Sequence, residues 1–239
     1  MKKTIISANE GGIANRVFCL VNAIHLSEKT GHKVVLYWKE DKDVTGKKRH
    51  DLQFNDLFKK KIGITLGSLK PFKKNPNYII LTSEKLVPEK KDIIRILKSL
   101  KFKFELDVKP NVGFHIRRGD FVKIGIAKVS PLDLFEKYIG RTIGVRFLAS
   151  DNSILKKDFA TKHKMITANS LKDDLEYLSK SDILMVSYGS TFSQLAWYLG
   201  SCKPYLHEVV DTLELHKWKN RRKGFMHPYK TWVYNKLFR

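Results

Sequence analysis

Apolar residues recur along the first half of the chain in two alternating patterns. The strands that we predict from short apolar runs span residues 4–8, 33–38, 62–66 and 78–82. The helices that we predict from apolar residues spaced three and four apart span 13–30, 52–58 and 91–100. Gly31 suits the end of the first helix. A polar stretch over 101–110 ends in proline, and we place a domain boundary there.

The second half alternates more regularly. Short apolar runs predict strands over 112–116, 145–149, 164–167, 183–187 and 203–209. Ser130, as a cap, and Pro131, as the first helical residue, predict one helix. Two further helices are predicted over 173–180 and 192–199. Strands and helices alternating at this spacing predict an α/β fold, in which parallel sheets carry helices on both faces.

Charge narrows the range of partners. The 239 residues carry a formal net charge of +22, which favours anionic partners such as nucleic acid, anionic lipid or phosphorylated ligands. Cys19 and Cys202 lie far apart and are expected to be buried free thiols, and no Cys/His spacing indicates zinc. We see no secretory leader and no apolar run of the roughly 18 residues that span a membrane. A cytoplasmic protein, in free or peripherally membrane-attached form, is expected.

The C-terminal segment, residues 211–239, differs from the rest. Its last 24 residues hold eight Lys or Arg, six aromatic residues and no acidic residue. Such a segment suits an anionic membrane surface or stacking on nucleic acid. The alternative is a segment that folds back over the N-terminal domain with its basic face in water. We expect this last arrangement, and we consider nucleic acid an unlikely partner.

Charged residues follow the strand at 112–116. Arg117, Arg118, Gly119 and Asp120 come directly after it, at the end where open α/β sheets bind ligands. A guanidinium grips phosphate oxygens with two parallel hydrogen bonds. The pattern favours a diphosphate clamp that works without a metal. The alternative is a strand end with solvated arginines, one of them paired to Asp120.

A glycine pair follows the first predicted strand and precedes the first helix. Gly11 and Gly12 would let backbone N–H groups approach a phosphate at the helix N-terminus. Ordinary tight turns use such pairs too.

Four segments together resemble one known family. Residues 115–120, His-Ile-Arg-Arg-Gly-Asp, resemble the HxRRxD signature of the α1,2/α1,6/protein-O-fucosyltransferase superfamily, and the spelling is nearest to the α1,2 branch. Three other segments follow in the family's order. They are residues 11–16 with 34–38, similar to GGxGNxxF…W; residues 147–151, similar to a strand that ends in Ser-Asp; and residues 174–193, similar to D…LSxxD…STFS. Ala14 and Arg16 depart from the pattern, which has glycine and, in the α1,2 branch, glutamine there.

The resemblance implies a GT-B-like fold with two Rossmann-like domains facing across a cleft. Residues 1–108 would hold the acceptor and residues 109–210 the nucleotide sugar. The implied reaction is an inverting, metal-independent transfer of L-fucose from GDP-fucose to a glycan hydroxyl, α1,2-like, with no cofactor. The metal-binding DxD spelling occurs at 41–43, but within a charged loop. The alternatives are a GT-B transferase for another nucleotide sugar, or a non-catalytic basic module that binds nucleic acid or membrane.

The resemblance also implies roles for single residues. Arg117 would be catalytic, by stabilising charge on the β-phosphate of the donor, and Glu10 would be the general base, as in one protein-O-fucosyltransferase branch. Asp174 would recognise guanine. The full donor-binding set is Gly11, Gly12, Asn15, His115, Arg118, Asp120, Asp151, Asp174, Ser190, Thr191, Phe192 and Ser193. Structural roles are the alternatives: a helix cap for Ser190 and Thr191, dipole stabilisation for Asp174, and ion pairing for Arg118.

Overall fold

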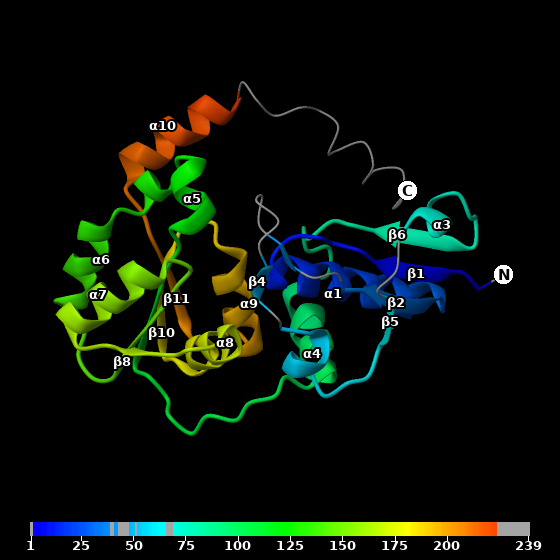
Figure 1. Ribbon diagram of the computed structural model, residues 1–239, viewed down its shortest axis with the longest axis horizontal. Helices are drawn as coiled ribbons and strands as arrows, with labels where there is room; N and C mark the ends of the chain where they lie inside the picture. Colours follow the sequence, from blue (N-terminus) through cyan, green and yellow to red (C-terminus); the bar gives the residue numbers. More distant parts are fainter. Residues whose placement is uncertain (1, 39–40, 43–47, 51, 66–68, 224–239) are drawn as a thin grey trace.

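The protein folds as two α/β domains that lie side by side (Figure 1). The computed structural model describes residues 2–38, 41–42, 48–50, 52–65 and 69–223. A chain segment without regular structure, after α4 (Lys90–Leu100) and before β7 (Val112–Ile116), joins the two domains. This segment contains the predicted boundary.

The N-terminal domain is built on a four-stranded parallel sheet in the order β5-β2-β1-β6. Its strands are β1 (Thr4–Ser7), β2 (Lys33–Tyr37), β5 (Gly63–Thr65) and β6 (Tyr78–Leu81). A separate antiparallel pair consists of β3 (Asp41–Lys42) and β4 (Lys48–His50). The helices besides α4 are α1 (Ile13–Thr30), α2 (Phe54–Leu57) and α3 (Lys70–Lys73). α1 is the predicted first helix, and it ends as expected at Gly31, whose φ is +68°.

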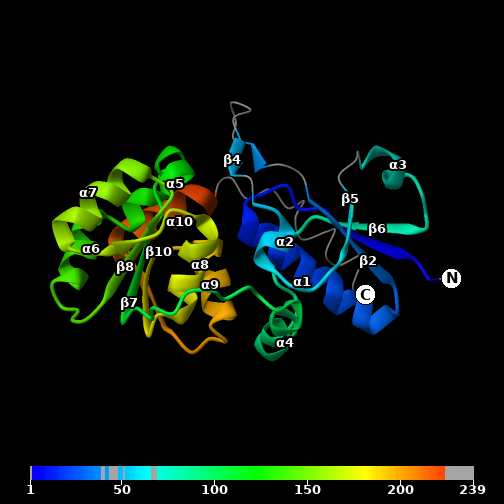
Figure 2. The ribbon, with the colours of Figure 1, turned by 60° about the horizontal axis from the view of Figure 1, so that its bottom comes forward.

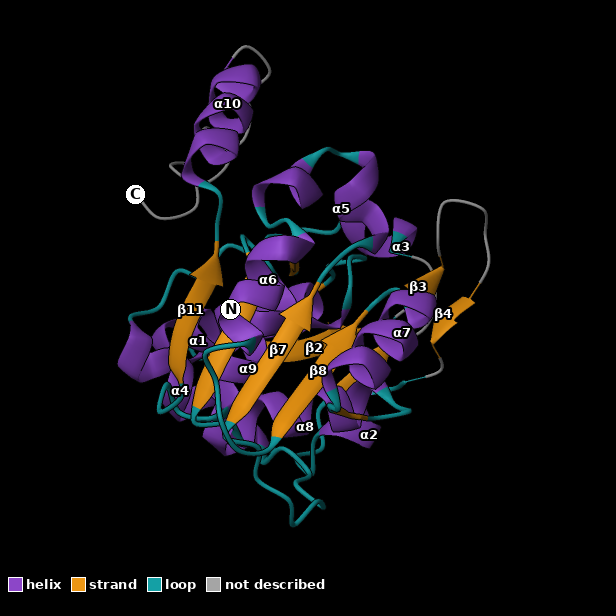
Figure 3. Ribbon diagram, turned by 90° about the vertical axis from the view of Figure 1, so that its left-hand side faces the viewer, coloured by secondary structure: helices purple, strands orange, loops and turns teal. Residues whose placement is uncertain are grey.

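The C-terminal domain is built on a five-stranded parallel sheet in the order β11-β10-β7-β8-β9. Besides β7, its strands are β8 (Arg146–Ser150), β9 (Ile166–Thr167), β10 (Ile183–Ser187) and β11 (Tyr205–Val209). The helical elements are α5 (Gly119–Lys123), η1 (Ile126–Val129), α6 (Leu132–Ile139), α7 (Ser153–His163), α8 (Leu171–Lys180), α9 (Thr191–Leu199) and α10 (Thr212–Lys223). Figure 3 shows α6 and α7 in front of this sheet, and α8 and α9 cover its other face.

One hydrophobic cluster spans the two domains. α9 packs against both α1 and α4, as Figure 2 shows. Phe18 of α1 meets Tyr198 of α9 edge to face, with ring centroids 6.1 Å apart. One continuous cluster of buried side chains runs from α1 and α4 into α8 and α9. Burial of this apolar surface fixes how the domains face each other.

Several elements differ from the predictions. α3, α5, η1, α7 and α10 were not predicted, and Ser130 is not the cap of α6, which begins after Pro131. α7 was not predicted because only Phe159 and Ala160 of its eleven residues are buried, so its apolar period is weak. The charged loop predicted over 39–50 contains the two short strands β3 and β4.

α10 is the described part of the C-terminal segment. It packs against η1 of the C-terminal domain, where Leu215 and Trp218 join Phe121 and Ile126 in a small apolar cluster. The prediction that the C-terminal segment folds back over the N-terminal domain also covers residues 224–239, which lie outside the described residues. Among the described helices, none combines the length and apolar character needed to cross a bilayer.

Candidate functional site

The two central strands of the C-terminal sheet define the candidate site. β7 and β10 are neighbours, although β8 and β9 separate them in the chain, so the strand order reverses between them. In open α/β sheets ligands bind beyond the carboxyl ends of the strands at such a reversal. Arg117 follows β7 there, and Ser190 precedes α9 just after β10. The fold thus brings together the arginine motif after β7 and the serine motif after β10. Arg117 and Ser187, which are in hydrogen-bond contact, lie 70 residues apart in the chain.

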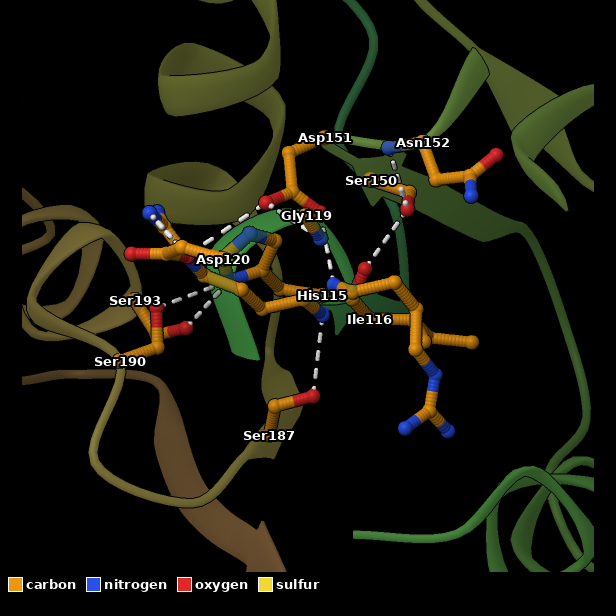
Figure 4. A network of polar contacts seen from close by, with 12 residues as sticks. His115, Ile116, Gly119, Asp120, Ser150, Asp151, Asn152, Ser187, Ser190 and Ser193 are labelled. Carbon is orange, nitrogen blue, oxygen red and sulfur yellow. Dashed lines mark hydrogen bonds and ion pairs between the residues drawn. The ribbon is translucent and has the colours of Figure 1, made fainter. Parts of the chain in front are cut away.

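Serines of the flanking strands hold the end of β7. Ser150 donates its hydroxyl to the carbonyl of Ile116 at 2.7 Å, and Ser187 accepts the N–H of Arg117 at 3.0 Å (Figure 4). Both serines are the last residues of their strands. Ser150 belongs to the Ser-Asp strand end noted at 147–151, whereas no role was predicted for Ser187, although a serine that closes each neighbouring apolar run was the signal.

Asp151 fixes the loop after β7. Its carboxylate accepts the N–H of Arg118 at 2.7 Å and that of Gly119 at 3.0 Å. A Cβ atom on Gly119 would lie 2.6 Å from an Asp151 oxygen, which explains glycine at this position. Asp151 was predicted to bind the donor, and the structure shows it positioning the loop that carries Arg117.

Arg117 is held by carboxylates but remains accessible. Its Nε and Nη2 atoms both donate to Asp120 Oδ1 at 3.0 Å, and Nε lies 3.5 Å from Asp151 Oδ2. The guanidinium lies 5.2 Å from the ring centroid of Phe121. With 25% of its side chain exposed, Arg117 is oriented by these contacts and can still meet a ligand.

Arg118 has a different role from its neighbour. Its buried guanidinium donates to the carbonyls of Ala127 at 2.7 Å and Ser130 at 2.8 Å. It therefore ties η1 to the loop after β7. These contacts support a structural role for the side chain rather than the predicted binding of the donor, because both acceptors are backbone carbonyls inside the protein. The predicted ion pair is replaced by hydrogen bonds to carbonyls.

His115 contacts the two serines at the start of α9. Ser193 Oγ lies 2.6 Å and Ser190 Oγ 3.3 Å from His115 Nδ1, and all three side chains are buried. Burial, with the charge on Arg117, lowers the pKa of His115 well below its usual range, so the ring is neutral at physiological pH. Phe192 packs 5.1 Å away, between ring centroids. The hydroxyls of Ser190 and Ser193, which were predicted to bind phosphate, thus face inward. The groups of α9 that remain to bind a phosphate are half-buried Thr191 and the backbone N–H groups of the first turn.

A hollow of about 890 Å³ lies beside Asp151, the residue that holds the loop after β7. Its walls come from the β8–α7 and β9–α8 connections, from α7 and from the first turn of α8, and they include Asp151, Lys156 and Asp174. Lys156 Nζ lies 2.8 Å and 3.0 Å from the two oxygens of Asp174. Burial raises the pKa of Asp174 to about 6, although the Lys156 ammonium opposes the shift. Lys156 was missed by the sequence analysis because α7 was not predicted.

The remaining predicted residues lie at the start of α1, in the N-terminal domain. Asn9 shapes this turn: it accepts the N–H of Gly11 at 2.8 Å and donates to Thr82 O at 2.6 Å. Gly12 precedes the first residue of α1, Asn15 lies in its first turn, and Glu10 is exposed. The buried side-chain oxygen of Asn15 has no hydrogen-bond partner in the described part of the protein.

The DxD spelling at 41–43 includes Asp43, which lies outside the described residues. Residues 2–38, 41–42, 48–50, 52–65 and 69–223 bring no three His, Cys, Asp or Glu side chains together as a ligand group.

Comparison with known proteins identifies the fold. The sequence matches no protein-family profile and no curated protein. The structure resembles NodZ α1,6-fucosyltransferase soaked with GDP-fucose, with a TM-score of 0.58 at 12% identity over 83% of this chain and 93% of that one. It also resembles fucosyltransferase NodZ from Bradyrhizobium, with a TM-score of 0.56 at 11% identity over 82% of this chain and 92% of that one. The TM-score to POFUT1 in complex with GDP-fucose is 0.58, at 11% identity over 87% of this chain and 98% of that one. The chain therefore has the two-domain, GT-B-like α/β fold of these fucosyltransferases.

Proposed function

We propose that the chain is a glycosyltransferase that transfers L-fucose from GDP-fucose to a glycan hydroxyl, with inversion and without a metal ion. The observation that carries this proposal is the position of Arg117 at the strand-order reversal between β7 and β10. The start of α9 follows β10 at the same edge of the sheet, and the hollow lined by Asp174 adjoins Asp151. Structures of the same fold were solved with GDP-fucose, which agrees with this assignment.

The donor diphosphate would lie between Arg117 and the first turn of α9. A guanidinium and a helix N-terminus both favour phosphate oxygens. Asp120 and Asp151 hold the guanidinium in one orientation before the donor arrives. The base would enter the hollow, where Asp174 presents a carboxylate to the N1–H and N2–H groups of guanine.

The reaction needs charge stabilisation rather than covalent catalysis. The acceptor oxygen forms a bond to C1 of fucose on one face while the bond from C1 to the β-phosphate oxygen breaks on the other. The bonding electrons leave with GDP, and the acceptor proton passes to a base, which we assign to Glu10. Arg117 would stabilise the charge that develops on the β-phosphate. The α1,2-like linkage rests on the spelling of residues 115–120 alone.

Calorimetric titration with GDP, GDP-fucose and UDP, in the presence of EDTA, tests the donor assignment. We expect GDP and GDP-fucose to bind and UDP to bind much more weakly, because uracil offers no second N–H group for Asp174. Tight UDP binding would replace fucose with another nucleotide sugar. Absence of all nucleotide binding by the folded protein would contradict the transferase assignment.

A second candidate function, a non-catalytic module for nucleic acid or anionic membrane, is favoured by the net charge of +22. Binding of this kind weakens steeply as salt concentration rises and does not discriminate between GDP and UDP. A filter-binding measurement with single-stranded RNA at several salt concentrations, next to the nucleotide titration, separates the two functions.

Replacing Glu10 by glutamine tests the general base. We expect the transfer rate to fall by about a hundredfold, since general base catalysis contributes at least that much, while GDP affinity stays unchanged. The measurement is the rate as a function of pH with a glycan acceptor. Glu84→Gln is the control, because Glu84 accepts a hydrogen bond from Asn9 at the same turn and has no assigned proton-transfer role. A full rate for Glu10→Gln at every pH would remove Glu10 from the mechanism.

A further inference from the structure

The linker that joins α4 to β7 is hydrogen-bonded to both domains, between which it runs in Figure 1. On the N-terminal side, the N–H of Lys103 donates to the carbonyl of Leu57, at the end of α2, at 2.8 Å. On the C-terminal side, the N–H groups of Glu105 and Leu106 both donate to Oε1 of Glu176 in α8, at 2.8 Å and 2.6 Å. One residue of the linker thus separates its bond to one domain from its bonds to the other.

Glu176 is a buried carboxylate that the proposed reaction does not use, and its side chain is 0% exposed. Its Oε1 also accepts from Nζ of Lys180, one helical turn later, at 2.8 Å, and Lys180 donates in addition to the carbonyl of Leu106. Its Oε2 is buried and has no hydrogen-bond partner among the residues that the structure describes. Such a carboxylate is a weak source of stability, because its desolvation and its unpaired oxygen offset the attraction to Lys180. The three donors that converge on Oε1 instead define the place of the linker on α8.

α8 lies between the linker and the hollow beside Asp151. Asp174, which lines the hollow, and Glu176, which holds the linker, are two residues apart in this helix. At about 100° per residue, their side chains leave α8 on nearly opposite sides. A shift of the linker on α8 therefore moves the N-terminal domain relative to the helix that lines the hollow.

Directional contacts set the register of the two domains within their apolar interface. Burial of apolar surface holds α9 against α1 and α4, but the hydrophobic effect has no preferred direction. Hydrogen bonds have narrow ranges of length and angle, and those to a carboxylate are stronger than those between neutral groups. The bonds to Glu176 therefore limit how far the N-terminal domain can slide along α8 and α9. Glu10 precedes α1 and Arg117 follows β7, so their separation depends on this limit.

We propose that Glu176 is a positioning residue: by fastening the linker to α8, it keeps Glu10 of the N-terminal domain at the distance from Arg117 that the transfer reaction needs. This inference rests on the proposed function, because it assumes that the donor contacts and the general base belong to different domains. Without the tie the donor would still bind, since Arg117, the first turn of α9 and the hollow all belong to the C-terminal domain. The acceptor oxygen and its base would instead be displaced from C1 of fucose. A displacement of about 1 Å can cost on the order of a hundredfold in rate.

Distances between spin labels test the tie directly. Cysteines replace Lys29, at the exposed end of α1, and Lys137, on α6, in a Cys202→Ser background, while buried Cys19 is not accessible to the label. Double electron–electron resonance then gives the distribution of distances between the two domains. We expect this distribution to widen or shift in Glu176→Met, because methionine offers no acceptor to the N–H groups of the linker. An unchanged distribution overturns the inference.

The consequence for catalysis is measured with GDP-fucose and with water as the acceptor. Single-turnover hydrolysis requires both Arg117 and Glu10, whereas the proposed contacts of GDP, whose affinity is measured by calorimetry, lie in the C-terminal domain. In Glu176→Met we expect the hydrolysis rate to fall about tenfold or more and the GDP affinity to stay unchanged. A single-turnover rate constant does not depend on the folded fraction, so a loss of stability alone would not lower it. A full hydrolysis rate with an altered distance distribution would overturn the positioning role.

A control in the same linker separates the possible failures. Glu105→Gln removes a side chain that is 63% exposed and pairs with Lys172, while its N–H keeps the bond to Glu176, so both readouts should stay at their wild-type values. If Glu176→Met does not fold, Glu176→Gln retains an acceptor oxygen and should show smaller changes in the same direction, and wild-type values for it would overturn the inference. Absence of GDP binding by wild type overturns the proposed function instead, and the label distances still decide whether Glu176 holds the linker.

Discussion

Replacing Arg117 by lysine should lower the rate of fucose transfer, and of GDP release from GDP-fucose in water, by about a hundredfold or more, as removal of one oxyanion donor does in other enzymes. Lysine keeps the charge but loses the planar fork that meets two phosphate oxygens at once. It also cannot repeat the paired contacts from Nε and Nη2 to Asp120. The charge would therefore remain near the site without its orientation.

The measurement is single-turnover release of GDP, together with GDP affinity by calorimetry. We expect affinity to change far less than rate, because the charge on the β-phosphate is largest in the transition state. Lys123→Met is the control, since it removes a positive charge from the exposed end of α5, the short helix that follows Arg117. Near-native turnover by Arg117→Lys would show that the guanidinium has no role in bond breaking.

Replacing Arg118 by methionine should instead destabilise the protein. The substitution leaves the carbonyls of Ala127 and Ser130 without their buried donor. We expect the free energy of unfolding to fall by about 2 kcal/mol and the thermal midpoint by roughly 4–8 °C. The loss is not larger because burial of the guanidinium is itself costly, as the lowered pKa of Arg118 indicates.

Thermal unfolding followed by circular dichroism gives this difference. Arg117→Met is the matched variant: it removes the same group one residue earlier, where a quarter of the side chain is exposed, and should change the midpoint little. Well below its midpoint, Arg118→Met should still bind GDP. A native midpoint for Arg118→Met would mean that η1 is held by other contacts, and loss of GDP binding by the folded variant would return Arg118 to the donor site.

Local pattern was enough to predict the strands of the two parallel sheets. The period of apolar residues depends only on near neighbours in the chain, so β7, β10 and the long helix α1 followed from the sequence. The same pattern located the charged residues at the end of a strand. Where the pattern is weak, as in α7, the helix forms through tertiary contacts, and neither the helix nor Lys156 could be predicted from local pattern.

Two α/β units, a basic chain and a pair of arginines at the carboxyl end of a strand all follow from the sequence. It takes the packed structure to show which arginine faces outward, that Ser190 and Ser193 turn inward to His115, and that Asp174 meets Lys156. The physical reason is that periodicity is a local property. The direction and partner of a polar side chain depend on which distant segments pack beside it, and α7, α8, α9 and β7 meet only when the sheet has formed.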